Sequence, residues 1–107
     1  MKRYDLHFAR LDPVQGAETG KTRPAVIVSD NLRNELLRTV VVCPLTTRLH
    51  SDWRTRLRVR CAGHAAEIAV EQIRVLSKSR LTTRIGSLTM RDAAALRQLL
   101  TEMYGEE

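Results

Sequence analysis

The stretch DPVQGAETGKTRPAVIVS, residues 12–29, decides the architecture that we expect for this chain. Two glycines in its first half allow positive φ angles, which predicts a shaped loop instead of a helix or strand. Pro24 keeps Arg23 out of the helical region, and the apolar run at residues 25–28, which is rich in β-branched residues, has the length of a buried strand. Arg23 is therefore expected where a loop meets rigid sheet, a position that suits a side chain held in front of a ligand.

The sequence around this stretch predicts several short strands. Apolar runs and period-two patterns place them at residues 3–11, 39–43, 54–60, 66–70 and 72–76, with a last one around Ile85. In the first strand, Tyr4, Leu6 and Phe8 are expected to share one face. The run at residues 39–43 is apolar enough for the centre of a sheet, and Pro44 is expected to end its hydrogen-bond ladder.

Two helices complete the prediction. Asp30 can cap a short helix over residues 31–37, and Thr89 can cap a C-terminal helix that carries one apolar stripe. Short strands closed by one amphipathic helix are typical of a mainly β protein that also contains α-helix. We therefore expect a compact, half-open β-barrel with a short helix after the second strand and an amphipathic C-terminal helix.

Length and composition predict one small domain, residues 1–107, that binds a polyanion. The net charge is +6 and comes from arginine far more than from lysine, which favours bidentate contacts with phosphate. A chain this short gains by burying its apolar strand at residues 39–43 against a second copy, so we expect a homodimer. His7, His50 and His64 lack the spacing of a metal site, so neither a metal nor another cofactor is predicted.

The sequence also bears on localisation. It contains neither an apolar stretch long enough to span a membrane nor the apolar core of a signal peptide. Its two cysteines have neither metal-site nor disulfide-framework spacing, which is typical of reduced core residues. Both observations predict a cytoplasmic protein without membrane association.

Three short motifs are spread along the chain. The first contains Asp12-Pro13, Gly16, Glu18 and Arg23-Pro24-Ala25-Val26, the second is Cys43-Pro44-Leu45-Thr46-Thr47-Arg48, and the third is Glu71-Gln72-Ile73-Arg74. Each alone is a common pattern, but together they are specific. On these motifs, nearly the whole chain resembles the MazF/PemK family of toxin endoribonucleases from toxin–antitoxin pairs. Tyr4 and Thr19 depart from the family pattern, which usually has glycine and glutamine at these places.

The resemblance implies an SH3-like barrel and an mRNA interferase, a toxin that cleaves single-stranded RNA in a sequence-selective, metal-independent reaction. In this reaction the 2′-hydroxyl attacks the neighbouring phosphorus and leaves a 2′,3′-cyclic phosphate and a 5′-hydroxyl end. The resemblance also implies a cognate acidic antitoxin that holds the toxin inactive. Metal-free cleavage needs a base for the 2′-hydroxyl, stabilisation of the charge on the phosphate, and an acid for the leaving oxygen.

Three residues are candidates for these tasks. Arg23 can contact the scissile phosphate in a fork, but a guanidinium is a poor proton donor, so we assign charge stabilisation first. The family arginine is catalytic and is often given the acid role as well. Thr46 could bond a phosphate oxygen or orient the 2′-hydroxyl, and the family places a catalytic Thr or Ser here, although a plain strand-end residue is the alternative. Glu18 is a candidate base, or a salt-bridge partner of Lys21 or Arg23.

Other residues are candidates for RNA contacts. Lys21 lies in the glycine-bearing loop, and Thr47 and Arg48 follow the candidate threonine. Gln72 could read the edge of a base or satisfy a backbone group at the end of a strand.

Four arginines alternate with other residues along one predicted strand, and we call them the arginine row: Arg54, Arg56, Arg58 and Arg60. On a strand, this spacing places four guanidinium groups on one face. Residues 48–60 carry five basic groups and one acidic group, which is +4 of the net +6. We interpret the row as a track for the RNA backbone, with Trp53 and His50 beside it to stack on bases. The alternatives are a solvated strand face and a surface that binds the acidic antitoxin.

Two rival functions are compatible with the same fold class. One is a non-enzymatic toxin that poisons DNA gyrase, as the CcdB family does. That family relies on a tryptophan near its C-terminus, whereas this chain ends Met103-Tyr104-Gly105-Glu106-Glu107. The other rival is an RNA-binding barrel without turnover, and RNA cleavage would distinguish it from the toxin.

Overall fold

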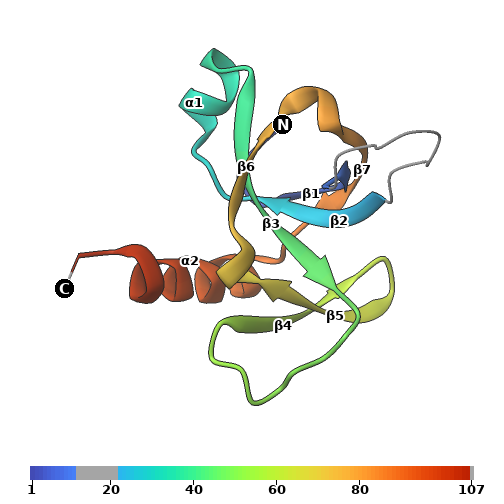
Figure 1. The fold of residues 1–107 in the computed structure, drawn as a ribbon, viewed down its shortest axis with the longest axis vertical. Coiled ribbons are helices and arrows are strands. Elements are labelled where there is room, and N and C mark those ends of the chain that lie inside the picture. The colour runs from blue at the N-terminus through green and yellow to red at the C-terminus, as the bar shows by residue number, and fades with distance from the viewer. Residues whose placement is uncertain (12–21, 107) are drawn as a thin grey trace.

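One antiparallel sheet forms the body of the computed structural model, which describes residues 1–11 and 22–106 (Figure 1). Along the chain the elements are β1 (Asp5–Arg10), β2 (Thr22–Ile27), α1 (Asn31–Leu36), β3 (Thr39–Thr46), β4 (Arg56–Cys61), β5 (His64–Ala69), the 3₁₀ turn η1 (Val70–Gln72), β6 (Arg74–Ser77), the 3₁₀ turn η2 (Lys78–Arg80), β7 (Leu81–Ser87) and α2 (Met90–Tyr104). The expected loop at residues 12–21, with Glu18 and Lys21, lies outside the described residues.

Strand β3 organises the sheet. The strands follow the order β4-β5-β3-β2-β1-β7, and β6 pairs with β3 outside this path. The first half of β3 pairs with β6 and its last two residues pair with β5, while β2 occupies the other edge. Because β3 is shared in this way, the sheet curls into a half-open barrel, which α2 flanks (Figure 1). The predicted fold class is confirmed, including the short helix after the second strand and the C-terminal helix.

The prediction that Pro44 ends the ladder is wrong. Strand β3 continues to Thr46, and Pro44 lies opposite Ala25 of β2. On its other edge, β3 exchanges β6 for β5 between Val42 and Leu45. Proline is tolerated here because no neighbouring strand pairs with this position on that edge, so the missing N–H breaks no ladder bond.

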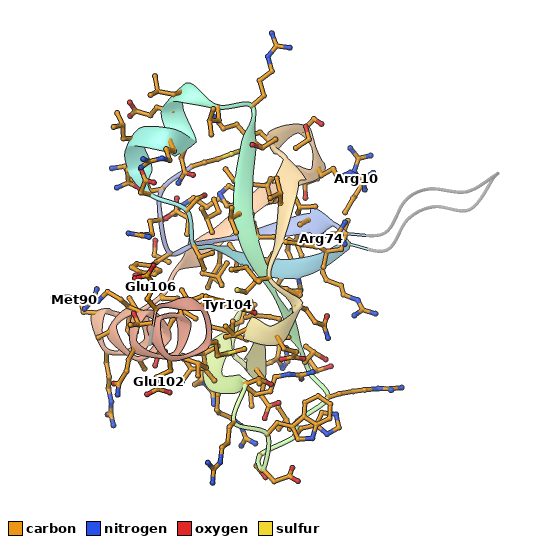
Figure 2. The ribbon with its side chains drawn as sticks, turned by 60° about the vertical axis from the view of Figure 1, so that its left-hand side comes forward. Arg10, Arg74, Met90, Glu102, Tyr104 and Glu106 are labelled. Carbon is orange, nitrogen blue, oxygen red and sulfur yellow. The ribbon has the colours of Figure 1, made fainter. Side chains whose placement is uncertain are left out.

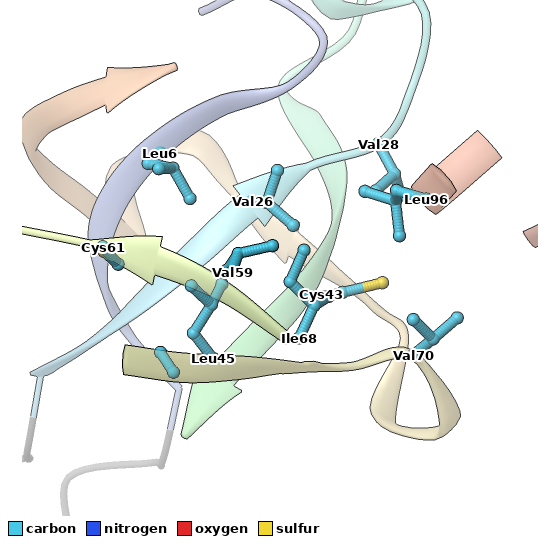
Figure 3. Close-up of a cluster of buried hydrophobic side chains, with 11 residues drawn as sticks. Leu6, Val26, Val28, Cys43, Leu45, Val59, Cys61, Ile68, Val70 and Leu96 are labelled. Carbon is cyan, nitrogen blue, oxygen red and sulfur yellow. The ribbon is translucent and has the colours of Figure 1, made fainter. Parts of the chain in front are cut away.

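The curled sheet has buried side chains on both of its faces. One cluster gathers residues from β1 to β5 around Ile68, together with Leu96 of α2 (Figure 3). A second cluster includes Ala9 and Val40. Strand β1 therefore contributes Leu6 to one cluster and Ala9 to the other. The face that Leu6 was expected to share with Tyr4 and Phe8 is thus not the only face of this strand with buried side chains.

The apolar run in β3 is buried within the chain itself. Val40, Val42 and Cys43 are almost inaccessible to solvent, which confirms that the strand is central. The run is therefore covered by other parts of the same chain, and our reason for expecting a homodimer, its burial against a second copy, does not hold. Large apolar side chains are exposed instead at α1, where the fractional exposures are 63% for Leu32, 73% for Leu36 and 51% for Leu37.

Helix α2 is capped and packed as predicted. The Thr89 hydroxyl oxygen accepts the N–H of Asp92 at 3.1 Å, and Leu96 is fully buried. At the other end, the Tyr104 hydroxyl donates to the Val70 carbonyl at 2.8 Å, which ties the helix to η1. Neither helix in the described part of the chain is long and apolar enough to cross a membrane.

Candidate functional site

A cleft of about 590 Å³ opens where β2, β3 and η1 meet. Predicted site residues from well-separated parts of the chain line it: Arg23, Thr46, Thr47, Arg48, His50, Arg56 and Gln72. The predicted residues Trp53, Arg54 and Arg58 are not part of this lining, while Glu18 and Lys21 lie outside the described residues. The fold therefore gathers most of the candidate residues at one place.

Arg23 and Thr46 line the same cleft because β2 begins where the neighbouring antiparallel strand β3 ends. The β2–β3 pairing runs as far as Ala25 opposite Pro44, so Arg23 near the start of β2 and Thr46 at the end of β3 lie beyond the same end of this pairing. Arg23 also pairs with Ala9 of β1, so its backbone is held within the sheet. Its side chain is exposed and meets no carboxylate among the described residues. A guanidinium held on rigid sheet, whose charge no carboxylate of residues 1–11 or 22–106 compensates, is available to a phosphate group.

The hydroxyl of Thr46 is oriented by the chain that follows it. Its Oγ1 accepts the backbone N–H of Arg48 at 3.1 Å, which leaves the hydroxyl proton free to be donated. The same turn directs Thr47 and Arg48 to the cleft lining. A hydroxyl donor and a guanidinium at one cleft mouth can bind the oxygens of a single phosphate.

Arg56 is engaged inside the protein. Its Nε and Nη2 donate to the Glu71 carboxylate at 2.9 Å and 2.7 Å, and its Nη1 lies 3.6 Å from an oxygen of Glu67. The Arg56 side chain is only 5% exposed, and its guanidinium carbon lies 4.6 Å from the centroid of the Trp53 ring. Arg56 therefore forms part of the cleft wall with its charge already compensated by carboxylates.

The expected face of four guanidinium groups is not formed. Strand β4 begins at Arg56, so Arg54 lies in the preceding turn. Arg58 is opposite Glu67 in the β4–β5 pair and its Nη2 lies 3.7 Å from that carboxylate, while the Nη2 of Arg60 donates to the Gly63 carbonyl at 2.7 Å. Arg56, Arg58 and Arg60 occupy alternate positions of β4 as the spacing predicts, but Arg54 lies outside the strand, so the prediction of four guanidinium groups on one strand face is wrong.

Glu67 holds the loop between β3 and β4. It is almost completely buried, and its Oε1 accepts the backbone N–H of His50 at 2.9 Å. The His50 ring stacks on Trp53 with centroids 4.0 Å apart and an interplanar angle of 12°. Trp53 thus already has a partner on its indole ring, and it borders a smaller hollow next to the main cleft.

Gln72 and Glu71 are presented by η1, whose position depends on distant contacts. The Val70 N–H donates to the Thr55 carbonyl at 3.1 Å, and the Val70 carbonyl accepts from Tyr104. Burial disfavours the charged form of Glu71, but hydrogen bonds from Arg56, the backbone and Thr55 outweigh it, so the pKa of Glu71 lies below its usual value. Gln72 lines the cleft beside this ion pair.

The contacts of Glu67 and Glu71 with the arginines of β4 were not predicted from the sequence. Ala62 and Gly63 form the hairpin turn, with φ angles of 52° and 80°. Counting outward from that turn pairs Arg58 with Glu67, so the turn was the signal that could have identified the carboxylate facing the arginines. Over the described ranges, no group of three or more His, Cys, Asp or Glu side chains is arranged to hold a metal ion.

A curled antiparallel half-barrel that presents arginine, threonine and amide side chains in one cleft defines a small basic β-barrel protein with a polar cleft. The chain belongs to the family of PemK-like, MazF-like toxins of type II toxin–antitoxin systems, whose family model matches residues 2–104. This finding confirms the resemblance deduced from the three motifs.

Similar proteins support the assignment. The chain is 34% identical over 94 residues to endoribonuclease MazF of Staphylococcus saprophyticus, covering 83% of this chain and 78% of that protein. It is 32% identical over 93 residues to endoribonuclease EndoA of Bacillus subtilis, covering 82% and 80%. Among solved structures, the Mycobacterium tuberculosis toxin MazF-mt6 matches with a TM-score of 0.80 at 21% identity, covering 96% of this chain and 98% of that one. A MazE–MazF structure from Deinococcus radiodurans matches with a TM-score of 0.84 at 20% identity, covering 100% and 98%. The structural matches establish the shared fold.

Proposed function

We propose that this chain is a sequence-selective, metal-independent endoribonuclease toxin that cleaves single-stranded RNA, with messenger RNA as the expected target, in the cleft between Arg23 and Thr46. The observation that carries the proposal is the presence of both side chains in the lining of one cleft, together with Thr47, Arg48 and Gln72. Family membership and the relatives named endoribonuclease give the same activity class. A barrel that binds RNA without cutting it could use the same two side chains to hold a phosphate, so cleavage itself distinguishes the two functions.

The proposed chemistry needs no group beyond the side chains, the RNA and solvent water. The 2′-oxygen forms a bond to phosphorus as the bond from phosphorus to the 5′-oxygen breaks, which leaves a 2′,3′-cyclic phosphate and a 5′-hydroxyl. Arg23 stabilises the charge that builds on the phosphate oxygens, and Thr46 donates a hydrogen bond to one of them or orients the attacking hydroxyl. Glu18 remains our candidate for the base that takes the 2′-hydroxyl proton, and the 5′-oxygen takes a proton as it leaves, either from Arg23 in the acid role that the resemblance implies or from solvent water.

RNA contacts are proposed at two levels. Thr47, Arg48, His50 and Gln72 line the cleft and are available to phosphate or base groups, and Lys21 is proposed as a further contact. Arg54 and Arg58 are exposed, and Arg58 lines the smaller hollow next to the cleft, so both can add attraction to the RNA backbone. For Arg56 and Trp53, the contacts within the protein support an indirect role, in which they shape the wall and the adjoining loop.

We also propose that residues 1–107 act as one toxin domain in a cytoplasmic homodimer that a cognate acidic antitoxin inhibits. The net charge of +6 supports an acidic partner. A similar structure is described as an endoribonuclease in complex with its cognate antitoxin. Charge attraction predicts that the rate of encounter with the antitoxin falls steeply with added salt. An antitoxin that binds equally fast at high salt would contradict this arrangement.

The test of the activity is direct. Purified protein is incubated with mixed RNA in EDTA, and the new 5′ ends are mapped, with folded Arg23→Ala as the control. We expect wild-type cuts at a recurring short sequence, with 5′-hydroxyl ends, and few cuts by the variant. RNA binding without any cutting would overturn the proposal in favour of the non-catalytic barrel. DNA gyrase poisoning without RNA cutting would favour the other rival.

A further inference from the structure

A second hollow adjoins the cleft on the side away from β4. It has a volume of about 190 Å³ and is lined by Leu11, Arg23, Pro44, Gln72 and Arg74. Arg23, Pro44 and Gln72 also line the main cleft, so the two spaces are continuous around these residues. A ligand that passes Arg23 in the cleft can therefore extend toward Arg74.

Arg74 is held in place at this hollow by its own side chain. Its Nη1 donates to the Leu11 carbonyl at 2.7 Å, which joins the start of β6 to the end of β1. A guanidinium has five N–H donors, and this bond uses one of them. In the part of the chain that the structure describes, Arg74 meets no carboxylate. Its charge is positioned, exposed and available to an anion.

Arg10 extends the same basic surface. It precedes Leu11, and its Nη2 donates to the Ser79 carbonyl at 3.3 Å, again to a backbone group and not to a carboxylate. Figure 2 shows Arg10 and Arg74 on the same side of the sheet, opposite α2 with Glu102 and Glu106. We call Arg10 and Arg74 the β1–β6 arginine pair.

The other side of the cleft differs in its charge balance. There, Arg56 and Arg58 face Glu67 and Glu71, so carboxylates within the protein compensate their positive charge. An RNA backbone is attracted most where guanidinium groups lack such partners. Arg74 therefore attracts an RNA backbone more strongly than Arg56 or Arg58 of β4 does, which supports the hollow with Arg74 as a continuation of the RNA path.

We propose that the β1–β6 arginine pair forms a second phosphate subsite, which binds the RNA backbone one or more nucleotides away from the phosphate at Arg23. The proposal rests on the proposed function, because it names where the RNA substrate continues beyond the cleavage site. Arg74 binds a backbone phosphate directly from the hollow, and Arg10 adds attraction at its outer end. Neither residue takes part in the chemical step.

The test measures binding and cleavage separately. Arg74→Gln is compared with Arg91→Gln, a control that removes the same charge from an exposed position on α2. Affinity is measured with an RNA that carries 2′-deoxyribose at the cleavage site, so that it binds without being cut. We expect Arg74→Gln to weaken binding about tenfold and to reduce the slope of log affinity against log salt by about one, while the control changes neither.

Cleavage then locates the subsite. With RNA extended on both sides of the cleavage site, Arg74→Gln should raise KM and leave kcat within about twofold of wild type, because the lost contact is made equally in the ground and transition states. The RNA is then shortened on one side at a time. Wild type and variant should have the same KM only when the side that reaches Arg74 has been removed, which identifies that side. Arg10→Gln should change KM in the same direction by less.

Two results would overturn the proposal. Arg74→Gln could match Arg91→Gln in affinity and salt slope, or it could lower kcat while KM stays unchanged, which would show that Arg74 only supports Arg23 through the sheet. If Arg74→Gln has a lower melting temperature than wild type, the RNA affinity of Arg10→Gln is measured instead. An RNA affinity of Arg10→Gln equal to that of wild type would reject the subsite. If wild-type protein binds the RNA with 2′-deoxyribose but does not cleave the same RNA with ribose at that position, the proposed activity is rejected. The comparison of binding between Arg74→Gln and wild type remains valid in that case.

Discussion

Arg56 and Glu71 form a forked ion pair in the wall of the cleft, with Nε and Nη2 of the arginine donating to the two carboxylate oxygens at 2.9 Å and 2.7 Å. The arginine side chain is 5% exposed and that of Glu71 is 28% exposed. This pair joins the start of β4 to η1, and η1 carries Gln72. An arginine that the sequence marked as an RNA contact is thus a structural part of the site.

The first prediction separates Arg56 from Arg58. Arg56→Gln leaves two carboxylates without their buried partner and should lower the free energy of unfolding by roughly 3 kcal/mol. Arg58→Gln removes an exposed charge and should change it by no more than about 0.5 kcal/mol. Urea unfolding of the two variants beside wild type measures both values. Equal stability of the two variants would contradict the structural role of Arg56.

The second prediction concerns pH. The pKa of Glu71 lies below its usual value of 4.5, so the folded protein binds fewer protons than the unfolded chain in that range. Stability from this group is therefore fully present above about pH 4.5 and is lost as the pH falls through the lower folded-state pKa. Glu71→Gln should be less stable than wild type at pH 7 and should lose less stability on acidification. The exposed Glu35→Gln on α1 serves as the control and should retain the wild-type pH profile.

The third prediction assigns Arg23 to the transition state. Charge builds on the phosphate oxygens only as the 2′-oxygen attacks, so Arg23→Ala should lower kcat by roughly 10²-fold with little change in RNA affinity. Arg23→Lys should give an intermediate rate because lysine restores the charge without the planar fork. Single-turnover cleavage by folded variants of matched melting temperature provides the comparison. A wild-type rate for Arg23→Ala would remove Arg23 from the mechanism.

The fourth prediction tests whether Thr46 acts on the same phosphate. Thr46→Ala should reduce kcat by less than Arg23→Ala does, since it removes one neutral hydrogen bond. The double variant should lose less than the sum of the two single losses, because both side chains serve one group. Rates of all four proteins on one RNA complete the cycle. Strictly additive losses would place the two residues at separate sites.

The fifth prediction concerns self-association. The exposed leucines at α1, and not the buried strand β3, provide apolar surface that a second copy can cover. Sedimentation should show wild-type dimers at micromolar concentration and a shift toward monomer for Leu36→Glu. Met90 is also exposed but lies at the start of α2, so Met90→Glu is the matched control and should remain dimeric. Monomeric wild-type protein under these conditions would exclude the dimer.

Local sequence by itself determined the order of most helices and strands, and the family resemblance that its motifs carry supplied the catalytic candidates. Asp30 caps α1 by accepting the N–H of Arg33, and Thr89 caps α2, because a cap involves residues only a few positions apart. Proline after Arg23 and the apolar run in β3 predicted strands for the same reason, since backbone preference and burial pattern act over short stretches. The three motifs carried the family resemblance without any knowledge of how they meet in space.

Only the tertiary structure decided what each side chain faces. Arg56 bonds Glu71 and Arg74 bonds Leu11 across long separations in sequence, and neither contact follows from spacing along one strand. Period-two alternation predicts that arginines share a face, but the partner strand and its register determine whether that face meets carboxylate, RNA or water. Strand β3 could likewise contain Pro44 only because its neighbours change at that point, which is a property of the assembled sheet.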